Sequence, residues 1–151
     1  MLGKTFGIPA LVAAMALAAC SGGGSGAGGG LYGGPPPTKP PSSNTPIQEM
    51  VAGRPGFVNP ANHRTLYFLS SDTPAGGTCT GGCLSVWPPI APSSGARAQN
   101  GFTIITRSDG TGKQWAHAGH PLYMFSGDTG PDQANGEGIP FAGGTWHVAR
   151  P

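Results

Sequence analysis

His117 and His120 are the residues of this chain whose types and spacing most directly suggest chemistry. They flank Ala118-Gly119, a pair that favours a tight turn. In a two-residue hairpin the two imidazoles would face each other with Cβ atoms about 5 Å apart, and they could then share a metal ion. Met124 or His147 could complete a soft site for copper. The alternative is that both histidines are exposed polar residues at a hairpin end.

Two cysteines, Cys79 and Cys83, are separated by Thr-Gly-Gly. Outside the cytoplasm two nearby thiols tend to oxidise, and the glycines let the chain turn tightly enough for disulfide geometry. The sequence therefore predicts a structural disulfide between them. A thiol-redox centre is the alternative. Against it, the spacing is C-x₃-C rather than C-x-x-C, and no helix N-terminus is evident that would activate a thiol.

Asp72 and Asp128 each end an apolar segment and precede a threonine. A carboxylate there can accept backbone N–H bonds in an Asx-type turn, which is the interpretation we favour. A pair of functional acids is the alternative, and glycosidase chemistry would need them within about 10 Å of each other. Asp128–Glu137 is rich in acids, Asn and Gly but misses the ligand spacing of an EF-hand calcium loop. Since no G-x-S-x-G, P-loop or dinucleotide-binding motif is present, we predict no catalytic residues and no enzyme activity.

Short apolar segments that alternate with turn signals must position these groups, and no segment has sustained helical periodicity. The pattern predicts a small all-β domain with antiparallel strands over residues 47–151. We expect strands at Gly56–Asn59, Thr65–Ser70, Phe102–Arg107, Lys113–His117, Pro121–Ser126 and Thr145–Ala149.

One stretch of this domain recurs. Leu66–Thr73 returns as Leu122–Thr129 at an offset of 56 residues, and a tryptophan follows each copy, Trp87 and Trp146. The repetition indicates two similar β units, each too small to bury its own apolar face, packed against each other. Successive residues of a strand point to opposite faces. Because both faces of Leu122–Phe125 are apolar, this segment should be buried on both sides.

The first 19 residues have the organisation of a signal peptide, with Lys4 in a short charged region and an apolar stretch too short to span a membrane. The stretch ends in Leu17-Ala18-Ala19-Cys20, which resembles a bacterial lipobox. We therefore expect cleavage before Cys20 and lipid, such as palmitate, on this cysteine. Ser21 beside it favours the outer membrane.

Residues 20–46 comprise this cysteine and a Gly/Ser-rich, then Pro-rich segment with almost nothing to bury, which predicts a disordered tether. As a coil it would span about 28 Å and hold the domain off the bilayer. Its PPPTKPP sequence could alternatively serve as a polyproline ligand. Charged residues make up only 9% of the chain and its formal net charge is +2, which excludes a broad basic face for nucleic acid.

The second copy of the repeated stretch reads Tyr123-x-Phe125-x-x-Asp128, and the first reads Tyr67-x-Leu69-x-x-Asp72. The chain also contains the stretches Cys79–Cys83, Trp87-Pro88-Pro89, Thr106–Gly110, His120–Tyr123 and Trp146-His147-Val148. Together these resemble the bacterial secreted-repeat lipoproteins of unknown function, whose motif is Tyr-x-aromatic-x-x-Asp. The first copy departs from that motif, with leucine at the aromatic position. The resemblance covers about residues 56–151 and implies a β-rich envelope lipoprotein, but no reaction.

These features together predict a non-catalytic lipoprotein, anchored by lipid on the periplasmic side of the outer membrane. Its β domain would bind a partner in the envelope, either a protein or a smaller ligand. Periplasmic copper binding through His117 and His120 is the second interpretation, and thiol-redox activity through Cys79 and Cys83 is the third.

Overall fold

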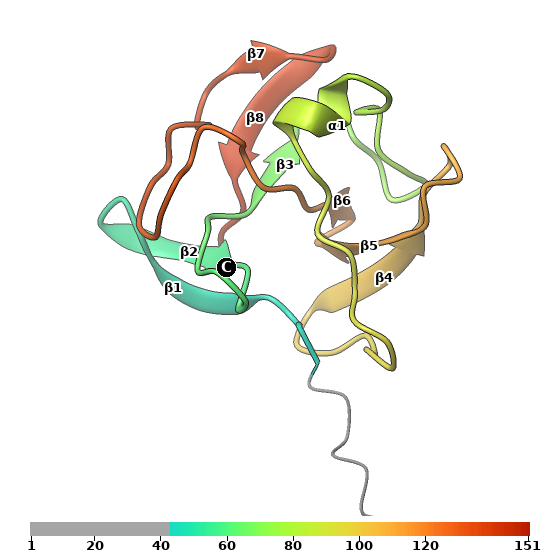
Figure 1. Cartoon of the computed structure of the whole chain (residues 1–151), viewed down its shortest axis with the longest axis horizontal. Helices are drawn as coiled ribbons and strands as arrows, with labels where there is room; N and C mark the ends of the chain where they lie inside the picture. Colours follow the sequence, from blue (N-terminus) through green and yellow to red (C-terminus); the bar gives the residue numbers. More distant parts are fainter. Residues whose placement is uncertain (1–42) are drawn as a thin grey trace, which may run out of the picture. The chain divides into compact units, whose positions relative to one another are not determined.

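The computed structural model describes residues 43–151, so the predicted signal peptide, Cys20 and tether residues 21–42 lie outside the described residues. Apart from one four-residue helix, the regular elements of the described part are short antiparallel strands joined by turns and loops, which confirms the predicted all-β class (Figure 1). It contains no helix long and apolar enough to cross a membrane. The elements in chain order are β1 (Ile47–Val51), β2 (Arg54–Val58), β3 (Tyr67–Leu69), α1 (Cys83–Val86), β4 (Phe102–Thr106), β5 (Lys113–His117), β6 (His120–Pro121), β7 (Pro140–Phe141) and β8 (Gly144–Val148).

The strands form three small sheets with the orders β1-β2, β3-β8-β7 and β4-β5-β6. The bounds of β5 agree with the prediction at both ends, and β4 ends one residue before the predicted end. β1 was not predicted, because most of its residues are exposed and it lacks apolar–polar alternation. β7 is too short to produce a strand pattern, and α1 is a single helical turn without measurable periodicity.

Two predicted strands are shorter than expected. Thr65–Ser70 forms only β3, and Pro121–Ser126 contributes its first residue to β6 and then an isolated bridge between Tyr123 and Tyr67. The backbone of these segments bonds to several partners in turn, since the Leu66 N–H donates to β2 and the Tyr67 N–H donates to Tyr123. A continuous ladder with one neighbour therefore does not form.

These two segments lie between two hydrophobic cores. Tyr67 and Tyr123 belong to one core, and Leu66 and Leu122 belong to the other. None of the four is more than 1% exposed, so the two-sided burial that the sequence predicts is present. The first core also contains Trp87 and Trp146, and the second contains Phe57, Phe102 and Trp115.

The folded part includes residues that the sequence places in the tether. The side chain of Asn44 donates to the carbonyl of Ala91 at 2.7 Å and accepts from the backbone N–H of Ser93 at 2.7 Å. The indole N–H of Trp115 also donates to it, at 3.1 Å. Thr45 is 8% exposed. Contacts with the domain therefore begin before Ile47.

Candidate functional site

The two copies of the repeat are joined by reciprocal bonds between the motif residues. The hydroxyl of Tyr67 donates to Oδ2 of Asp128 at 2.6 Å, and the hydroxyl of Tyr123 donates to Oδ2 of Asp72 at 3.0 Å. The backbone N–H of each tyrosine donates to the carbonyl of the other, at 2.8 and 2.9 Å. Each tyrosine thus bonds to the aspartate of the other copy, so an approximate two-fold relation exchanges the copies. We call these four residues the Tyr–Asp clamp.

The other oxygen of each clamp carboxylate accepts backbone N–H groups. Oδ1 of Asp72 accepts from the backbone N–H of Thr78 at 2.6 Å and from its hydroxyl at 2.8 Å. Oδ1 of Asp128 accepts from the N–H of Asn135 at 3.0 Å. The donors lie six and seven residues downstream, so an Asx turn, whose donor lies two residues on, is not the geometry. Both aspartates are buried, 4% and 1% exposed, and close a longer loop each.

Burial shapes the protonation of the clamp tyrosines. Desolvation, together with the negative charge of Asp72, raises the pKa of Tyr123 to about 12. Desolvation and the bond to Asp128 raise the pKa of Tyr67 well above its usual range. Both phenols are therefore neutral hydrogen-bond donors near neutral pH, and neither can act there as a general base.

The tryptophan that follows each copy completes the clamp. The rings of Trp87 and Trp146 stack with centroids 3.8 Å apart and an interplanar angle of 2°. Tyr67 packs edge-on against Trp87 at 5.5 Å, and Tyr123 packs edge-on against Trp146 at 5.0 Å, so each tyrosine contacts the tryptophan of its own copy and the two contacts obey the same two-fold relation. Both indoles are fully buried, so they form the centre of a core and are not a ligand platform.

The aromatic position of the motif has a packing role. Phe125 stacks on Trp87 with centroids 4.5 Å apart. Leu69 holds the corresponding place in the first copy, where it pairs with Trp146 across β3 and β8 and is fully buried. The position needs an apolar side chain against a tryptophan, which explains why the first copy tolerates leucine.

Two glycines that the sequence analysis did not single out are needed for the clamp to close. A Cβ on Gly77 would lie 2.0 Å from the hydroxyl of Tyr123, and one on Gly136 would lie 2.7 Å from the ring of Trp87. The N–H of Gly136 also donates to the hydroxyl of Tyr67, at 3.3 Å. Gly77 lies five residues after Asp72 and Gly136 eight residues after Asp128, so the two positions are not equivalent in the repeat and no shared spacing pointed to them.

Cys79 and Cys83 form the predicted disulfide, with Cα atoms 5.4 Å apart. Cys83 begins α1, so a helix start is present where the sequence showed none, but a four-residue helix has little dipole to offer a thiol. Cys79 is fully buried and Cys83 is 9% exposed, both within the core that contains Trp87. This burial restricts the access of a protein reductant to the disulfide.

Arg107 connects the disulfide loop to the second copy, a role that the sequence did not suggest. Its side chain is 2% exposed, and the guanidinium donates to the carbonyl of Cys79 at 2.8 Å and lies 5.9 Å from the centre of the Tyr123 ring. Asp109 pairs with it at 2.6 Å, and this pairing holds the pKa of Asp109 well below its usual range. Gln114 accepts a further bond, so the buried cation is compensated.

The candidate copper residues occupy the predicted hairpin. His117 pairs with His120 across β5 and β6, and both turn residues have positive φ, 48° and 82°, as a type I′ turn requires. The rings, however, pack on phenylalanines: His117 on Phe57 at 4.6 Å and on Phe102 at 4.9 Å, and His120 on Phe68 at 4.8 Å. Burial lowers the pKa of His117.

The other candidate ligands have partners of their own. The sulfur of Met124 accepts from the amide of Asn59 at 3.4 Å, and His147 contacts Glu137 at 2.9 Å. Within residues 43–151, no group of three or more His, Cys, Asp or Glu side chains could hold a metal ion. The structure thus pairs His117 with His120 across the hairpin, but within the described residues no third His, Cys, Asp or Glu side chain joins them in a possible metal site.

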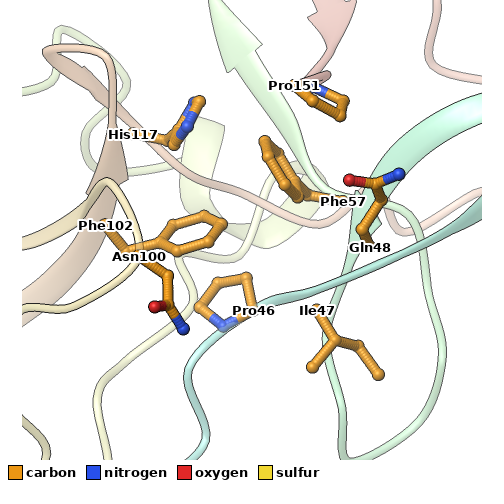
Figure 2. A pocket seen from close by; sticks show the side chains of 8 residues that line it. All are labelled: Pro46, Ile47, Gln48, Phe57, Asn100, Phe102, His117 and Pro151. Atoms are coloured by element: carbon orange, nitrogen blue, oxygen red, sulfur yellow. The ribbon is translucent and has the colours of Figure 1, made fainter.

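An open pocket of about 600 Å³ lies beside this hairpin (Figure 2). The rings of Phe57, Phe102 and His117 pack on one another beneath it, and the amides of Gln48 and Asn100 stand on opposite sides of its opening. Pro46, Ile47 and Pro151 complete the lining. No Asp, Glu, Lys or Arg side chain lines it, so we call it the uncharged pocket. Its volume is typical of small-ligand sites.

The fold and the clamp define a β domain in which two copies of one repeat interlock. Residues 103–150, which contain the second copy, match the family model described as a secreted repeat of unknown function. This match confirms the resemblance drawn from the Tyr-x-aromatic-x-x-Asp motif. Comparisons with curated proteins and with solved structures found no match. A secreted repeat indicates a location outside the cytoplasm, in the envelope or beyond it.

Proposed function

We propose that this protein is a non-catalytic lipoprotein of the bacterial envelope and that its β domain binds a partner at the uncharged pocket. The observation that carries the proposal is a division of roles among the side chains. The chemically capable groups of the motif bond to one another inside a core. A pocket large enough for a ligand opens on the surface instead.

The first half of this division argues against catalysis. The clamp carboxylates accept a tyrosine hydroxyl on one oxygen and backbone N–H groups on the other, so they have little capacity left for a substrate. Both are buried, and both tyrosines stay protonated near neutral pH. The disulfide is buried as well, which disfavours the thiol-redox alternative.

The second half supports binding. The lining of the uncharged pocket combines aromatic rings and proline with a few convergent amides, the usual composition of a recognition site. Exposed apolar side chains lie next to it on β1, where Ile47 is 40% and Met50 57% exposed. Such residues are a common feature of surfaces that become covered in a complex.

The anchor is the part of the proposal that rests on the sequence. Lipid on Cys20 would hold the domain at the periplasmic face of the outer membrane, and the Gly/Pro-rich segment would give it reach. The test is labelling with an alkyne-bearing palmitate in cells that make the wild-type chain or a Cys20→Ala variant. Label and membrane fractionation in the wild type alone support the anchor, whereas an unlabelled wild type refutes it.

Binding is tested by site-specific photo-crosslinking in intact cells. A benzophenone amino acid replaces Gln48 at the mouth of the uncharged pocket or, as the matched control, Ser85, which is exposed on α1. Light should produce a discrete adduct of higher mass from position 48 and none from position 85. If position 48 gives no adduct, or if positions 48 and 85 give the same adducts, the pocket is not a specific binding site.

Copper binding keeps one observation in its favour, which is the pairing of His117 with His120 across the hairpin. His117 also lines the uncharged pocket, so a metal there would change the same surface. Copper binding is therefore the second candidate function, and a calorimetric titration with copper and zinc ions tests it.

A further inference from the structure

We propose that β1 is a docking edge for an extended peptide of a partner protein, which adds as a strand and places an apolar side chain over the uncharged pocket. This inference rests on the proposed binding function and specifies the ligand class. It follows from the backbone of β1, its side chains and the charges around it.

The backbone of β1 has hydrogen-bonding groups that face away from its neighbour. Val51 pairs with Arg54 across a two-residue turn, so bonded and non-bonded pairs alternate from there along the hairpin. Gln48 and Met50 fall at the non-bonded positions, and their N–H and C=O groups point to the outer edge. Phe57, which lies opposite Gln48, confirms that this pair is a non-bonded one. Its N–H points away from β1 and donates to the carbonyl of Ala149.

This outer edge has no bonded neighbour in the described part of the chain. No backbone bond joins Gln48 or Met50 to another element there, and β1 ends its two-stranded sheet. Edge strands usually carry charged side chains, above all lysine, or a proline or a bulge that prevents further pairing. β1 has no lysine, proline or bulge, its register with β2 is unbroken, and Glu49 is its single charged residue. The edge is therefore competent to accept another strand.

The side chains indicate what kind of strand fits. Gln48 projects on the same face as its partner Phe57, which packs beneath the uncharged pocket. A residue of an added strand opposite Gln48 would project on that face too, at the mouth of the pocket. Because no charged side chain lines the pocket, an apolar residue is favoured there. Met50, 57% exposed, offers the next apolar contact along the edge.

Charge argues against a second copy of this chain as the occupant. An antiparallel pair of β1 strands that uses both outward residues of each copy must pair Gln48 with Met50. That register places Glu49 directly opposite Glu49 of the other copy, and like charges in such pairs are destabilising. The partner peptide should accordingly be apolar opposite Gln48 and not acidic opposite Glu49.

The experiment selects linear peptides from a phage-displayed library on the full-length lipoprotein in detergent, with counter-selection on a Met50→Pro variant. Proline at position 50 removes the methionine side chain and, of the backbone hydrogen-bonding groups, only an outward N–H, and Pro55 already occupies the matching position of β2. Met50→Ala is the matched control, because it removes the side chain and keeps the N–H. Selected peptides should bind the wild type and the alanine variant but not the proline variant.

Amide hydrogen exchange on the wild type with a selected peptide gives a test that needs no variant. With peptide at ten times its Kd, exchange of the Gln48 and Met50 amides should slow about tenfold, whereas that of Glu49, already bonded to β2, should not change. Peptides that perturb the pocket without this alternating protection would overturn strand addition and leave the proposed function standing. Strand addition is also overturned if no peptide is selected, or if the protection appears only when the chain dimerises. Absence of a crosslink at position 48 in cells tells separately against the proposed function.

Discussion

Removing one hydroxyl from the clamp should destabilise the protein by an amount that depends on which copy loses it. Tyr67→Phe leaves Oδ2 of the buried Asp128 without its donor and leaves the N–H of Gly136 without its acceptor. A hydrogen bond to a charged group contributes about 1.5–3 kcal/mol, and an orphaned buried N–H adds about 1 kcal/mol. We expect Tyr67→Phe to lower the free energy of unfolding by about 3 kcal/mol.

The chain supplies its own matched control in Tyr123→Phe. The bond that this variant loses is longer, 3.0 Å against 2.6 Å. Asp72 keeps two donors from Thr78, whereas Asp128 keeps one from Asn135. The loss should therefore be about 1.5 kcal/mol, half of that for the first tyrosine.

Urea unfolding of the disulfide-intact protein, followed by tryptophan fluorescence, measures both losses. At an m-value of about 1.5 kcal/mol/M, the midpoints should fall by about 2 M for Tyr67→Phe and about 1 M for Tyr123→Phe. The near-ultraviolet circular dichroism of the stacked Trp87–Trp146 pair should be retained before unfolding in both variants. Equal losses or a reversed order would refute the predicted ranking of the two bonds, and losses under about 0.5 kcal/mol in both variants would refute the clamp as a stabilising device.

Three further predictions concern the core, the pH response and the hairpin. Gly136→Ala should lower the free energy of unfolding by about 1–3 kcal/mol through overpacking, whereas Gly130→Ala, which has open space around its Cβ, should leave the urea midpoint unchanged. Because the pKa of Tyr123 rises from 10 in the unfolded chain to about 12 in the fold, its stabilising contribution is complete below pH 10 and is lost as the pH approaches 12. Alkaline unfolding monitored by tyrosinate absorbance should show this loss, and stability that is constant over that interval would contradict it. For the copper hypothesis, calorimetry with Cu(I), Cu(II) and Zn(II) should show binding that a His117→Ala, His120→Ala variant loses, and a silent wild type ends the hypothesis.

Local signals predicted the parts of the fold in which neighbours in sequence are also neighbours in space. β5 was predicted at both ends because glycine-bearing turns bound it, and the turn that follows it predicted the pairing of His117 with His120. The Cys79–Cys83 disulfide belongs to this group, since only three residues separate the cysteines. β1 could not be found in this way because its side chains are mostly exposed and carry no pattern.

The clamp could not be predicted because its partners lie far apart in the chain. Tyr67 and Asp128 are 61 residues apart, and Tyr123 and Asp72 are 51. The sequence showed that the copies exist, but two β units can pack in many orientations. The exchanged arrangement satisfies the buried hydroxyls and carboxylates together, and this pairing is visible only once the backbone brings them within hydrogen-bond distance.

By itself, the sequence determined the all-β class, the internal repeat, the disulfide and the resemblance to secreted-repeat lipoproteins, because composition, alternation and short spacings encode them locally. Only the tertiary structure decided that the motif residues are hydrogen-bond partners of one another inside a core. It also decided that His117 packs on phenylalanines and that an uncharged pocket opens beside an unpaired strand edge. The physical reason is that burial and hydrogen-bond partners depend on long-range packing, which no local pattern of residues specifies.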